Sequence, residues 1–191
     1  MNNKKIIAFL GTDGSGKTTM IKKLEKYLKN YKISTKYIHL RPTIFNKNKK
    51  VVLNPHDQDS RSKFFNFIKL FYWLFIFKFY FIFKSSNNFK VFFFDRYPHD
   101  LLYDPIRYRF NLNKKITKKI LELFPTPDLW IIMSGNPLKI WNRKREIKYN
   151  VLEILLRRYV RFGVSTPNTI IFNKNSDFKK IINFIKNKIL L

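Results

Sequence analysis

The chain has 191 residues, and its 39 lysines and arginines against 12 aspartates and glutamates give a formal net charge of +27. This length suits one domain, so we expect a single domain over residues 1–191 that buries its core without crosslinks. The sequence has no cysteine, which excludes a disulfide-rich secreted scaffold and a zinc site built on thiolates. No apolar leader precedes the first expected strand, and we therefore expect a cytoplasmic protein.

The large positive charge predicts contact with polyanions, and two explanations of it compete. A basic surface attracts nucleic acid by releasing counterions. Lysine, asparagine, phenylalanine and isoleucine are abundant together, as they are when an A/T-rich genome biases codon use, and that bias alone makes a surface rich in lysine. Eight of the ten arginines lie in two windows, 96–109 and 143–161, and their planar forks suit bidentate contacts with phosphate. We expect a small phosphorylated acceptor as the partner, not nucleic acid.

Five short apolar runs predict β-strands, and segments with helical periodicity separate them. The expected strands are Ile6–Leu10, Lys36–Leu40, Val91–Phe94, Leu129–Met133 and Thr169–Phe172. The expected helices are Lys17–Lys29, Arg61–Lys84, Pro98–Tyr103, Lys114–Leu123, Pro137–Lys148, Val151–Phe162 and Asp177–Leu190. This alternation indicates an α/β fold with a parallel sheet between layers of helices, and with ligands beyond the carboxyl ends of the strands.

A phosphate-binding pattern joins the first strand to the first helix. Residues 11–18 read Gly-Thr-Asp-Gly-Ser-Gly-Lys-Thr and match G-x-x-x-x-G-K-[ST], whose glycines let backbone N–H groups turn toward phosphate oxygens. Lys17 is expected to bridge the outer phosphates, and Thr18 to hold Mg²⁺ through its hydroxyl at the positive end of the helix dipole. The predicted phosphate-binding site comprises Gly11, Thr12, Asp13, Gly14, Ser15, Gly16, Lys17, Thr18 and Thr19.

The apolar run Val91–Phe94 leads directly into Asp95 and Arg96. In phosphate-loop proteins a carboxylate at such a strand end lies beside Mg²⁺, so Asp95 is the second candidate metal ligand. Arg96 follows at the same strand end, where a guanidinium can hold a phosphoryl donor or acceptor in line. The alternative for Asp95 is a cap on the following helix.

The segment Phe64–Phe83 is unusual because seventeen of its twenty residues are apolar or aromatic. It is long enough to span a bilayer, but a span would separate the Gly11 loop from Asp95, although both must meet one nucleotide. On a helical wheel one half of the circumference holds Lys63, Asn66, Lys69, Lys78 and Lys84. The other half is wholly apolar. Two alternatives remain: a buried or dimer-interface helix, and a helix lying peripherally on the inner face of a membrane with its lysines toward anionic lipid.

These motifs together resemble those of the thymidylate kinases. The stretch Phe9–Thr19 matches that family's phosphate loop, including the aspartate inside it, and Asp95-Arg96-Tyr97 matches its Asp-Arg-Tyr motif. Arg41-Pro42 stands where the family carries Arg-Glu-Pro, and an arginine-bearing lid follows the fourth strand, as in the family. The resemblance implies a three-layer P-loop NTPase fold with a five-stranded parallel sheet. It also implies ATP and Mg²⁺ as co-substrates and phosphoryl transfer to a nucleoside monophosphate such as dTMP, often within a homodimer.

The resemblance further implies roles for single residues. Asp13 would contact the acceptor sugar, Arg41 and Arg96 would hold the acceptor phosphate, and Arg143 or Arg145 would fold over the donor phosphates. The alternative for the two lid arginines is a solvated basic helix face. The expected catalytic residues are Lys17, Arg96, Arg143 and Arg145. The expected acceptor-binding residues are Asp13, Arg41, Arg96, Tyr97, Asp100, Asp104 and Arg107.

The acceptor half departs from the family. The glutamate expected after Arg41 is absent, and residues 98–109 replace the family's Ser-x-x-Ala-Tyr-Gln run with Pro-His-Asp-Leu-Leu-Tyr-Asp-Pro-Ile-Arg-Tyr-Arg. This segment resembles thymidylate-kinase-like proteins encoded in bacterial surface-polysaccharide loci. The alternative acceptor is therefore a sugar or a surface-polysaccharide intermediate near the membrane.

Within the altered segment, Asp100 and Asp104 are four residues apart and would share one face of a short helix begun by Pro98. Paired carboxylates can grip hydroxyl groups, although ion pairs with nearby arginines are the alternative. Arg107 and Arg109 are two apart, so in an extended segment they would point the same way and take an anionic group.

Overall fold

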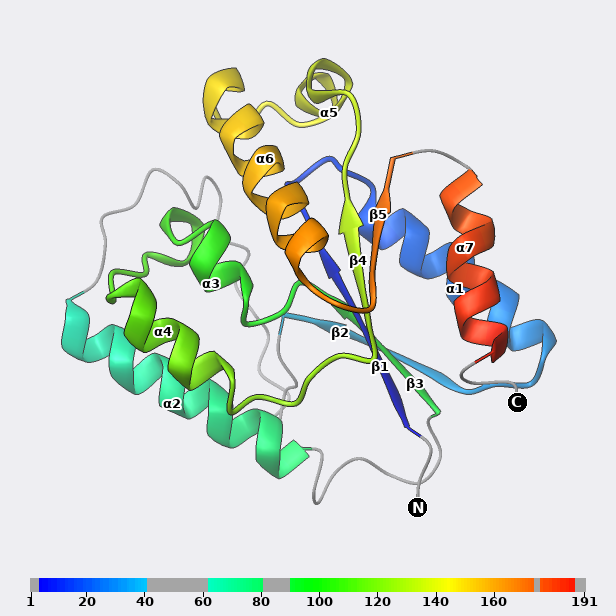
Figure 1. Cartoon of the computed structure of the whole chain (residues 1–191), viewed down its shortest axis with the longest axis horizontal. Coiled ribbons are helices and arrows are strands. Elements are labelled where there is room, and N and C mark those ends of the chain that lie inside the picture. The colour runs from blue at the N-terminus through cyan, green and yellow to red at the C-terminus, as the bar shows by residue number, and fades with distance from the viewer. Residues whose placement is uncertain (1–3, 41–61, 81–89, 174–175, 188–191) are drawn as a thin grey trace. The chain divides into compact units, whose positions relative to one another are not determined.

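The computed structural model describes residues 4–40, 62–80, 90–173 and 176–187 (Figure 1). The chain divides into two compact units. The sheet unit is made of residues 1–39, 87–97 and 127–191, and the helical unit of residues 40–86 and 98–126. The expected single domain over residues 1–191 stays a prediction.

The sheet unit is built on five parallel strands. They are β1 (Lys5–Leu10), β2 (Thr35–His39), β3 (Val91–Asp95), β4 (Leu129–Met133) and β5 (Thr169–Phe172). Their order across the sheet is β2-β3-β1-β4-β5, so the chain crosses to one side of β1 first and to the other side later. The register pairs Phe9 with both Asp95 and Ile131. Ligands of open parallel sheets bind where the strand order reverses, which here is the carboxyl end of β1.

Four helices of the sheet unit cover both faces of this sheet. They are α1 (Lys17–Asn30), α5 (Pro137–Arg143), α6 (Tyr149–Ser165) and α7 (Ser176–Ile185). In Figure 1, α1 and α7 lie on one side of the strands and α6 on the other. Because both faces are covered, the central strands read as continuous apolar runs with no polar alternation. The three-layer α/β architecture with five parallel strands confirms the fold expected from the sequence.

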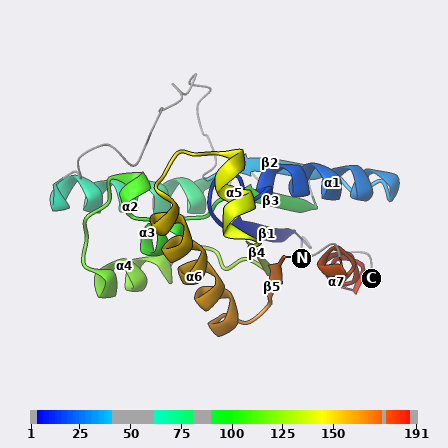
Figure 2. The same cartoon turned by 90° about the horizontal axis from the view of Figure 1, so that it is seen from above.

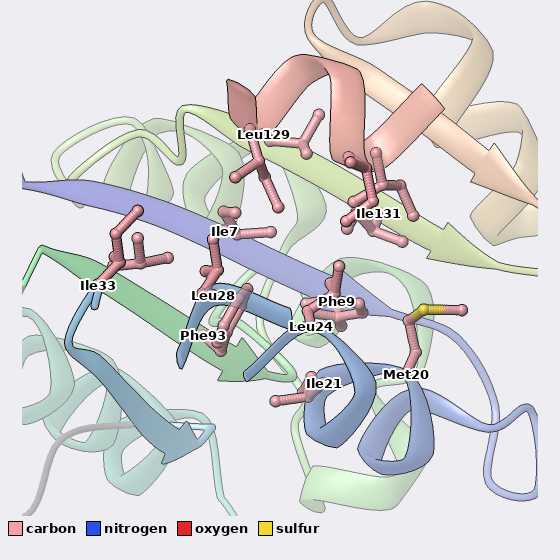
Figure 3. Close-up of a cluster of buried hydrophobic side chains, with 14 of the residues drawn as sticks. Ile7, Phe9, Met20, Ile21, Leu24, Leu28, Ile33, Phe93, Leu129 and Ile131 are labelled. Carbon is pink, nitrogen blue, oxygen red and sulfur yellow. The ribbon is translucent and has the colours of Figure 1, made fainter. Parts of the chain in front are cut away.

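The main core cluster lies between one face of the sheet and helices α1 and α7 (Figure 3). Ile7 and Phe9 of β1 meet Ile21 and Leu24 of α1, and all four side chains are fully buried. Alternate strand residues face the opposite side, where the Trp130 ring meets Phe162 of α6 edge to face at 5.2 Å. Each fully buried side chain of this size stabilises the fold by about 1.5–3 kcal/mol. The core therefore fixes the strand ends that carry the loop after β1 and the residues after β3.

The helical unit contains α2 (Lys63–Phe79), α3 (Asp100–Tyr103), the short 3-10 helix η3 (Ile106–Tyr108) and α4 (Lys114–Leu121). Helix α2 packs through Phe77 against Phe124, with ring centroids 5.3 Å apart, and through Trp73 against Tyr108, at 6.1 Å. Asn113 caps α4 by accepting a hydrogen bond from the Lys115 backbone. Figures 1 and 2 both show α2 at the margin of this unit.

The orientation of α2 contradicts a fully buried helix. Asn66 is buried, and the Lys69 ammonium donates to the Tyr108 carbonyl at 2.8 Å, so the half of the helix that holds these polar residues faces the unit's interior. The apolar half faces outward, and Phe64 keeps 70% of its surface exposed. Among the described residues, no helix combines the length and the apolar character needed to cross a bilayer.

Helix α5 ends earlier than the sequence suggests, and the predicted end of helix α2 lies outside the described residues. Helix α2 ends at Phe79, within the expected range 61–84, of which residues 61 and 81–84 lie outside the described residues. Helix α5 ends at Arg143, five residues early, because Lys144 adopts an extended backbone with φ −151° and ψ 97°. The Trp141 indole N–H donates to the Ile147 carbonyl at 2.9 Å and holds the segment after the helix folded back on it.

The expectation of an extended segment at Arg107 and Arg109 is wrong. Residues 106–108 form η3, and Arg109 ends it in the left-handed region with φ 53°. Pro105 explains the difference, since its ring fixes φ near the helical value and suits the position just before a helical turn. The Tyr108 N–H donates to the Pro105 carbonyl at 3.1 Å and closes that turn. The two arginines therefore do not share a side by strand geometry.

Candidate nucleotide site

The loop after β1 has the backbone of a phosphate cradle. Gly11 has φ 143°, and a Cβ there would lie 2.7 Å from the Met133 carbonyl oxygen, so a side chain does not fit. Gly16 has φ 91° and precedes the first residue of α1 in the left-handed region that favours glycine. The Ser15 hydroxyl donates to the Thr12 carbonyl at 2.7 Å and holds the loop closed. The N–H groups in the first turn of α1 point out of the helix end, and together with the helix dipole they favour an anion there.

Lys17 lies inside this loop. Its side chain is buried, and its ammonium donates to the carbonyls of Gly11 at 3.0 Å and Thr12 at 2.8 Å. A buried ammonium is costly unless oxygen atoms surround it, and these carbonyls supply them. The positive charge is thus held among the backbone groups that the sequence assigns to phosphate binding.

Thr18 and Asp95, the two expected metal ligands, lie together. The Thr18 hydroxyl donates to Asp95 Oδ2 at 2.6 Å. The sheet explains the meeting, because Asp95 ends β3 opposite Phe9 of the neighbouring β1. A hydroxyl and a carboxylate are hard oxygen donors of the kind that Mg²⁺ prefers, and one or two protein oxygens suffice where phosphates supply others. Among the described residues, no group of three or more His, Cys, Asp or Glu side chains is placed to hold a metal ion.

Tyr37 is a site residue that sequence reasoning missed. Its hydroxyl donates to Asp95 Oδ2 at 3.2 Å. Burial first, and the negative charge of Asp95 second, raise the pKa of Tyr37 above its usual range, so the hydroxyl keeps its proton and remains a donor. The register of the sheet explains the contact: His39 pairs with Asp95 across β2 and β3, and Tyr37 lies two residues earlier on the same side of β2.

Arg96 forms the strongest ion pair of the described site. Its side chain is 2% exposed, and its guanidinium lies 2.7 Å from a carboxylate oxygen of Asp13 in the phosphate loop. The Arg96 backbone has φ 76°, a conformation that costs a non-glycine residue about 1–3 kcal/mol and tends to occur at functional sites. The ion pair and the hydrogen bond from the Arg96 N–H to the Phe9 carbonyl at 2.9 Å hold it there.

Tyr97, an expected acceptor-binding residue, lies within the core. Its ring is fully buried and meets Phe94 at 5.1 Å and Trp130 at 5.4 Å, both edge to face. Burial raises the pKa of Tyr97 well above its usual value. These contacts give the side chain a packing role that supports the turn at Arg96.

The two lid arginines differ in what they contact. Arg143, at the end of α5, donates to the Gly14 carbonyl of the phosphate loop at 3.3 Å. The Arg145 guanidinium instead lies over the Trp141 ring, 4.8 Å from its centroid. Both side chains are exposed. The structure therefore brings Arg143, and not Arg145, into contact with the predicted cradle.

The expected acceptor residues of the helical unit are mostly buried. Asp100 is fully buried and accepts a hydrogen bond from the Tyr108 hydroxyl at 2.9 Å. Asp104 is also buried, at the end of α3, and its N–H donates to the Asp100 carbonyl at 2.8 Å. Arg107 is half-buried in η3. Arg41 lies outside the described residues.

His99, which precedes α3, is partly buried. Burial lowers its pKa to about 4, so the ring is neutral at pH 7.

No protein-family model and no curated protein matches the sequence. A thymidylate kinase from Candida albicans superposes with a TM-score of 0.60 at 17% identity, over 96% of this chain and 92% of that one. A thymidylate kinase from Ehrlichia chaffeensis gives 0.58 at 14% identity, over 95% and 98%.

A deoxyadenosine kinase from M. mycoides, solved with bound dATP, gives a TM-score of 0.54 at 18% identity, over 95% of this chain and 99% of that one. The chain has a thymidylate-kinase-like fold. At these identities the likeness extends to the fold, while residue roles rest on the geometry described above.

Proposed function

We propose that the protein is a P-loop kinase that transfers the γ-phosphoryl group of ATP to a nucleoside monophosphate, as in the conversion of dTMP to dTDP. One observation carries the proposal: the Thr18 hydroxyl meets Asp95 at 2.6 Å beside a loop that also encloses the Lys17 ammonium. A hydroxyl, a carboxylate and an ammonium at one cradle are the parts that phosphoryl transfer needs, since catalysis there is mainly positioning and charge neutralisation.

In the proposed reaction an oxygen of the acceptor phosphate attacks the γ-phosphorus. A new P–O bond forms as the bond from that phosphorus to the β–γ bridging oxygen breaks, and ADP leaves with the electron pair. The N–H groups of residues 11–19 and the Lys17 ammonium bind the phosphates of ATP and orient them. No covalent enzyme intermediate is required.

Thr18 and Asp95 would hold Mg²⁺, which would supply positive charge to the β- and γ-phosphate oxygens. Tyr37 orients the Asp95 carboxylate through its hydrogen bond at 3.2 Å. This contact fixes one carboxylate oxygen and leaves the carboxylate limited freedom to rotate.

In this proposal one arginine contacts the transferred phosphoryl group and another holds the acceptor phosphate. Arg143 already reaches the phosphate loop at Gly14, so it is the lid arginine that we assign to the transferred group, where such a residue contributes on the order of 10³–10⁵ in rate. Arg96 would hold the acceptor phosphate, with Asp13 fixing its guanidinium at 2.7 Å. Arg145, held over Trp141, would form the outer wall of the lid.

A second candidate acceptor is a sugar or surface-polysaccharide intermediate. Residues 98–109 favour it, since they lack the family's base-recognition run and place Asp100 beside Tyr108 in a buried pair. The chemistry at the phosphate loop would be the same. The expected homodimer and cytoplasmic location also stay predictions.

An acceptor screen tests the proposal. ATP consumption is followed with purified protein and Mg²⁺ against dTMP, the other nucleoside monophosphates, and phosphorylated sugars. Turnover restricted to nucleoside monophosphates supports the first candidate, and turnover restricted to sugar phosphates supports the second. ATP binding without transfer to any acceptor would contradict both and leave a nucleotide-binding module without catalysis.

A further inference from the structure

The outward side of α2 forms a continuous apolar surface, which we call the aromatic face. It consists of Phe64, Phe65, Phe67, Ile68, Phe71, Tyr72 and Phe75. Exposure reaches 70% at Phe64 and 62% at Phe65 and Phe75. The ring centroids of Phe67 and Phe71 are 4.6 Å apart, and those of Phe75 and Phe79 are 5.9 Å apart and stacked.

The orientation of α2 is fixed by specific contacts on its inward side. Asn66 is fully buried there, and Trp73 and Phe77 pack into the helical unit. Lys69 donates to the Tyr108 carbonyl and lies 5.2 Å from the Trp73 ring. Turning the helix over would bury more aromatic surface but would break these polar contacts. The exposure of the aromatic face is therefore a property of the fold.

The size of this face exceeds what a monomer usually leaves bare. A large side chain of this kind carries about 150–250 Å², and between 42% and 70% of each of the seven residues is exposed. Together they therefore present roughly 600–900 Å² of surface. The largest apolar patch on an ordinary monomer is about 300–600 Å² and tends to be functional. A surface above that range predicts a partner.

The charge around the aromatic face identifies the kind of partner. Helix α2 contains no acidic residue, and Lys63 and Lys78 are exposed beside its phenylalanines. In the same unit α4 exposes Lys114, Lys115, Lys118 and Lys119. Among the described residues of the helical unit, Glu122 is the single exposed carboxylate.

We propose that the aromatic face docks α2 in the plane of an anionic lipid bilayer. Phenylalanines insert at the boundary of headgroups and acyl chains, and lysines beside them reach lipid phosphates while their stems lie along apolar surface. A second copy of this chain fits the aromatic face less well. Two facing α2 helices would bring together four exposed lysines, Lys63 and Lys78 of each copy, with no carboxylate on either helix. Each copy also carries a net charge of +27, which anionic lipid neutralises and a second copy opposes.

Vesicle flotation tests the proposal with the full-length protein. One set of vesicles is pure phosphatidylcholine, and the other contains about 30% phosphatidylserine to supply negative surface charge. The wild type is expected to float with the anionic set and not with the neutral set. Floating with neither set overturns the proposal.

Substitutions on the aromatic face distinguish docking through this face from attraction of the whole basic protein to anionic lipid. Phe64→Ser with Phe75→Ser is expected to lower partitioning onto anionic vesicles by about 100-fold, because both rings leave the interface. The matched control is Ile154→Ser with Val164→Ser, two exposed apolar residues of α6 in the sheet unit. The control is expected to bind like the wild type. Equal binding by the Phe64/Phe75 variant overturns the proposal.

Lysines are tested in the same way. Lys63→Gln with Lys78→Gln is expected to weaken binding by about 10-fold or more, since each lysine near an anionic surface contributes about fivefold. Lys26→Gln with Lys29→Gln removes the same charge from exposed positions on α1 and serves as the control. If both pairs weaken binding equally, the attraction belongs to the whole protein and the proposal fails.

Sedimentation without vesicles tests whether a second copy of the chain covers the aromatic face. A wild-type dimer that the Phe64/Phe75 variant converts into a monomer would assign the aromatic face to a second copy and overturn the lipid proposal. Thermal melting is measured for every variant, and Phe71→Ser alone is the milder substitution if the double variant melts early. The proposal expects Phe71→Ser to melt like the wild type and to bind anionic vesicles more weakly.

Discussion

At the carboxyl ends of β1 and β3 the buried side chains are charged, whereas on the outward side of α2 the exposed side chains are aromatic. Lys17, Asp95 and Arg96 are each at most 6% exposed, and each has an oxygen or nitrogen partner within 3.0 Å. Phe64 and Phe75 have most of their surface exposed. Both regions depart from the usual distribution, in which apolar side chains are buried and charged ones are exposed. Each region needs an explanation, since buried charge and exposed apolar area both cost free energy.

The two regions differ in how that cost is offset. Within the phosphate site the charged groups satisfy one another, so the arrangement is stable in itself and ready for an anionic ligand. On α2 nothing among the described residues covers the aromatic face, so its cost is offset only when a partner binds. This contrast predicts that substitutions at the site disturb function or folding, while substitutions on α2 disturb association.

The largest expected effect is from Lys17→Ala. Loss of the ammonium removes charge that stabilises the transferring phosphoryl group, and we expect kcat to fall by about 1,000-fold, or about 4 kcal/mol. Thermal stability is expected to change little, because the loop carbonyls that Lys17 contacts can turn to water. A coupled ATPase assay and a thermal melt measure both, with Lys26→Ala as an exposed control on α1. Retained activity would remove the kinase proposal.

Asp13→Asn is expected to act on folding as well as activity. It leaves the Arg96 guanidinium, 2% exposed, without its opposite charge, and breaking a largely buried ion pair from one side costs about 3 kcal/mol. Denaturant unfolding measures the free energy of unfolding. Asp128→Asn is a control, since the ion pair of Asp128 with Lys5 is partly exposed and is expected to contribute no more than about 1 kcal/mol. A similar loss in both variants would mean that burial does not strengthen the Arg96 pair.

His99 makes the free energy of unfolding depend on pH. Burial lowers its pKa to about 4 in the folded state, against about 6.5 when unfolded. The contribution of His99 to the free energy of unfolding is complete above pH 6.5. It falls as the pH drops, because the unfolded chain takes up the proton before the folded chain does. At pH 5 we expect a loss of about 2 kcal/mol relative to pH 7.

Denaturant unfolding at several pH values measures this dependence in the wild type and in His99→Gln. The variant should show a flatter profile between pH 7 and pH 5. A wild-type profile as flat as that of the variant would place the imidazole in contact with water.

Tyr37→Phe should have the smallest effect and sharpens the account of Asp95. Removing one hydroxyl frees the carboxylate to rotate, and we expect the Mg²⁺ concentration for half-maximal activity to rise by about fivefold, near 1 kcal/mol. Tyr31→Phe is the control, because the Tyr31 hydroxyl contacts Tyr27 on an exposed part of α1 and its C-terminal turn. An unchanged Mg²⁺ requirement would limit Tyr37 to packing.

Much of the fold could be predicted from local pattern. The strands at Leu129–Met133 and Thr169–Phe172 have the predicted bounds, since short apolar runs between turn residues leave few alternatives. The meeting of Thr18 and Asp95 followed from motif spacing and from parallel strands ending at one edge. Tyr37 was missed because a tyrosine in an edge strand carries no local signal of a carboxylate two residues beyond its pairing partner.

Other errors arose where one residue overrides a pattern. Arg107 and Arg109 have strand-like spacing, but Pro105 starts a helical turn before them. Tyr97 directly follows Arg96 in the sequence, but consecutive residues after a strand point in different directions, so the two side chains do not share surroundings. The Arg96 side chain contacts Asp13, while Tyr97 enters the core between Phe94 and Trp130.

The sequence by itself determined the phosphate loop, the alternation of strands and helices, and the apolar half of α2, because each depends on the spacing of residues within a short segment. Only the tertiary structure decided which half of α2 faces outward. A helical wheel separates apolar from polar residues, and it suggests that the apolar half is the buried one. The chain buries Asn66 and directs the Lys69 ammonium to the Tyr108 carbonyl, a partner far along the sequence. A contact between residues so far apart cannot be detected from local periodicity.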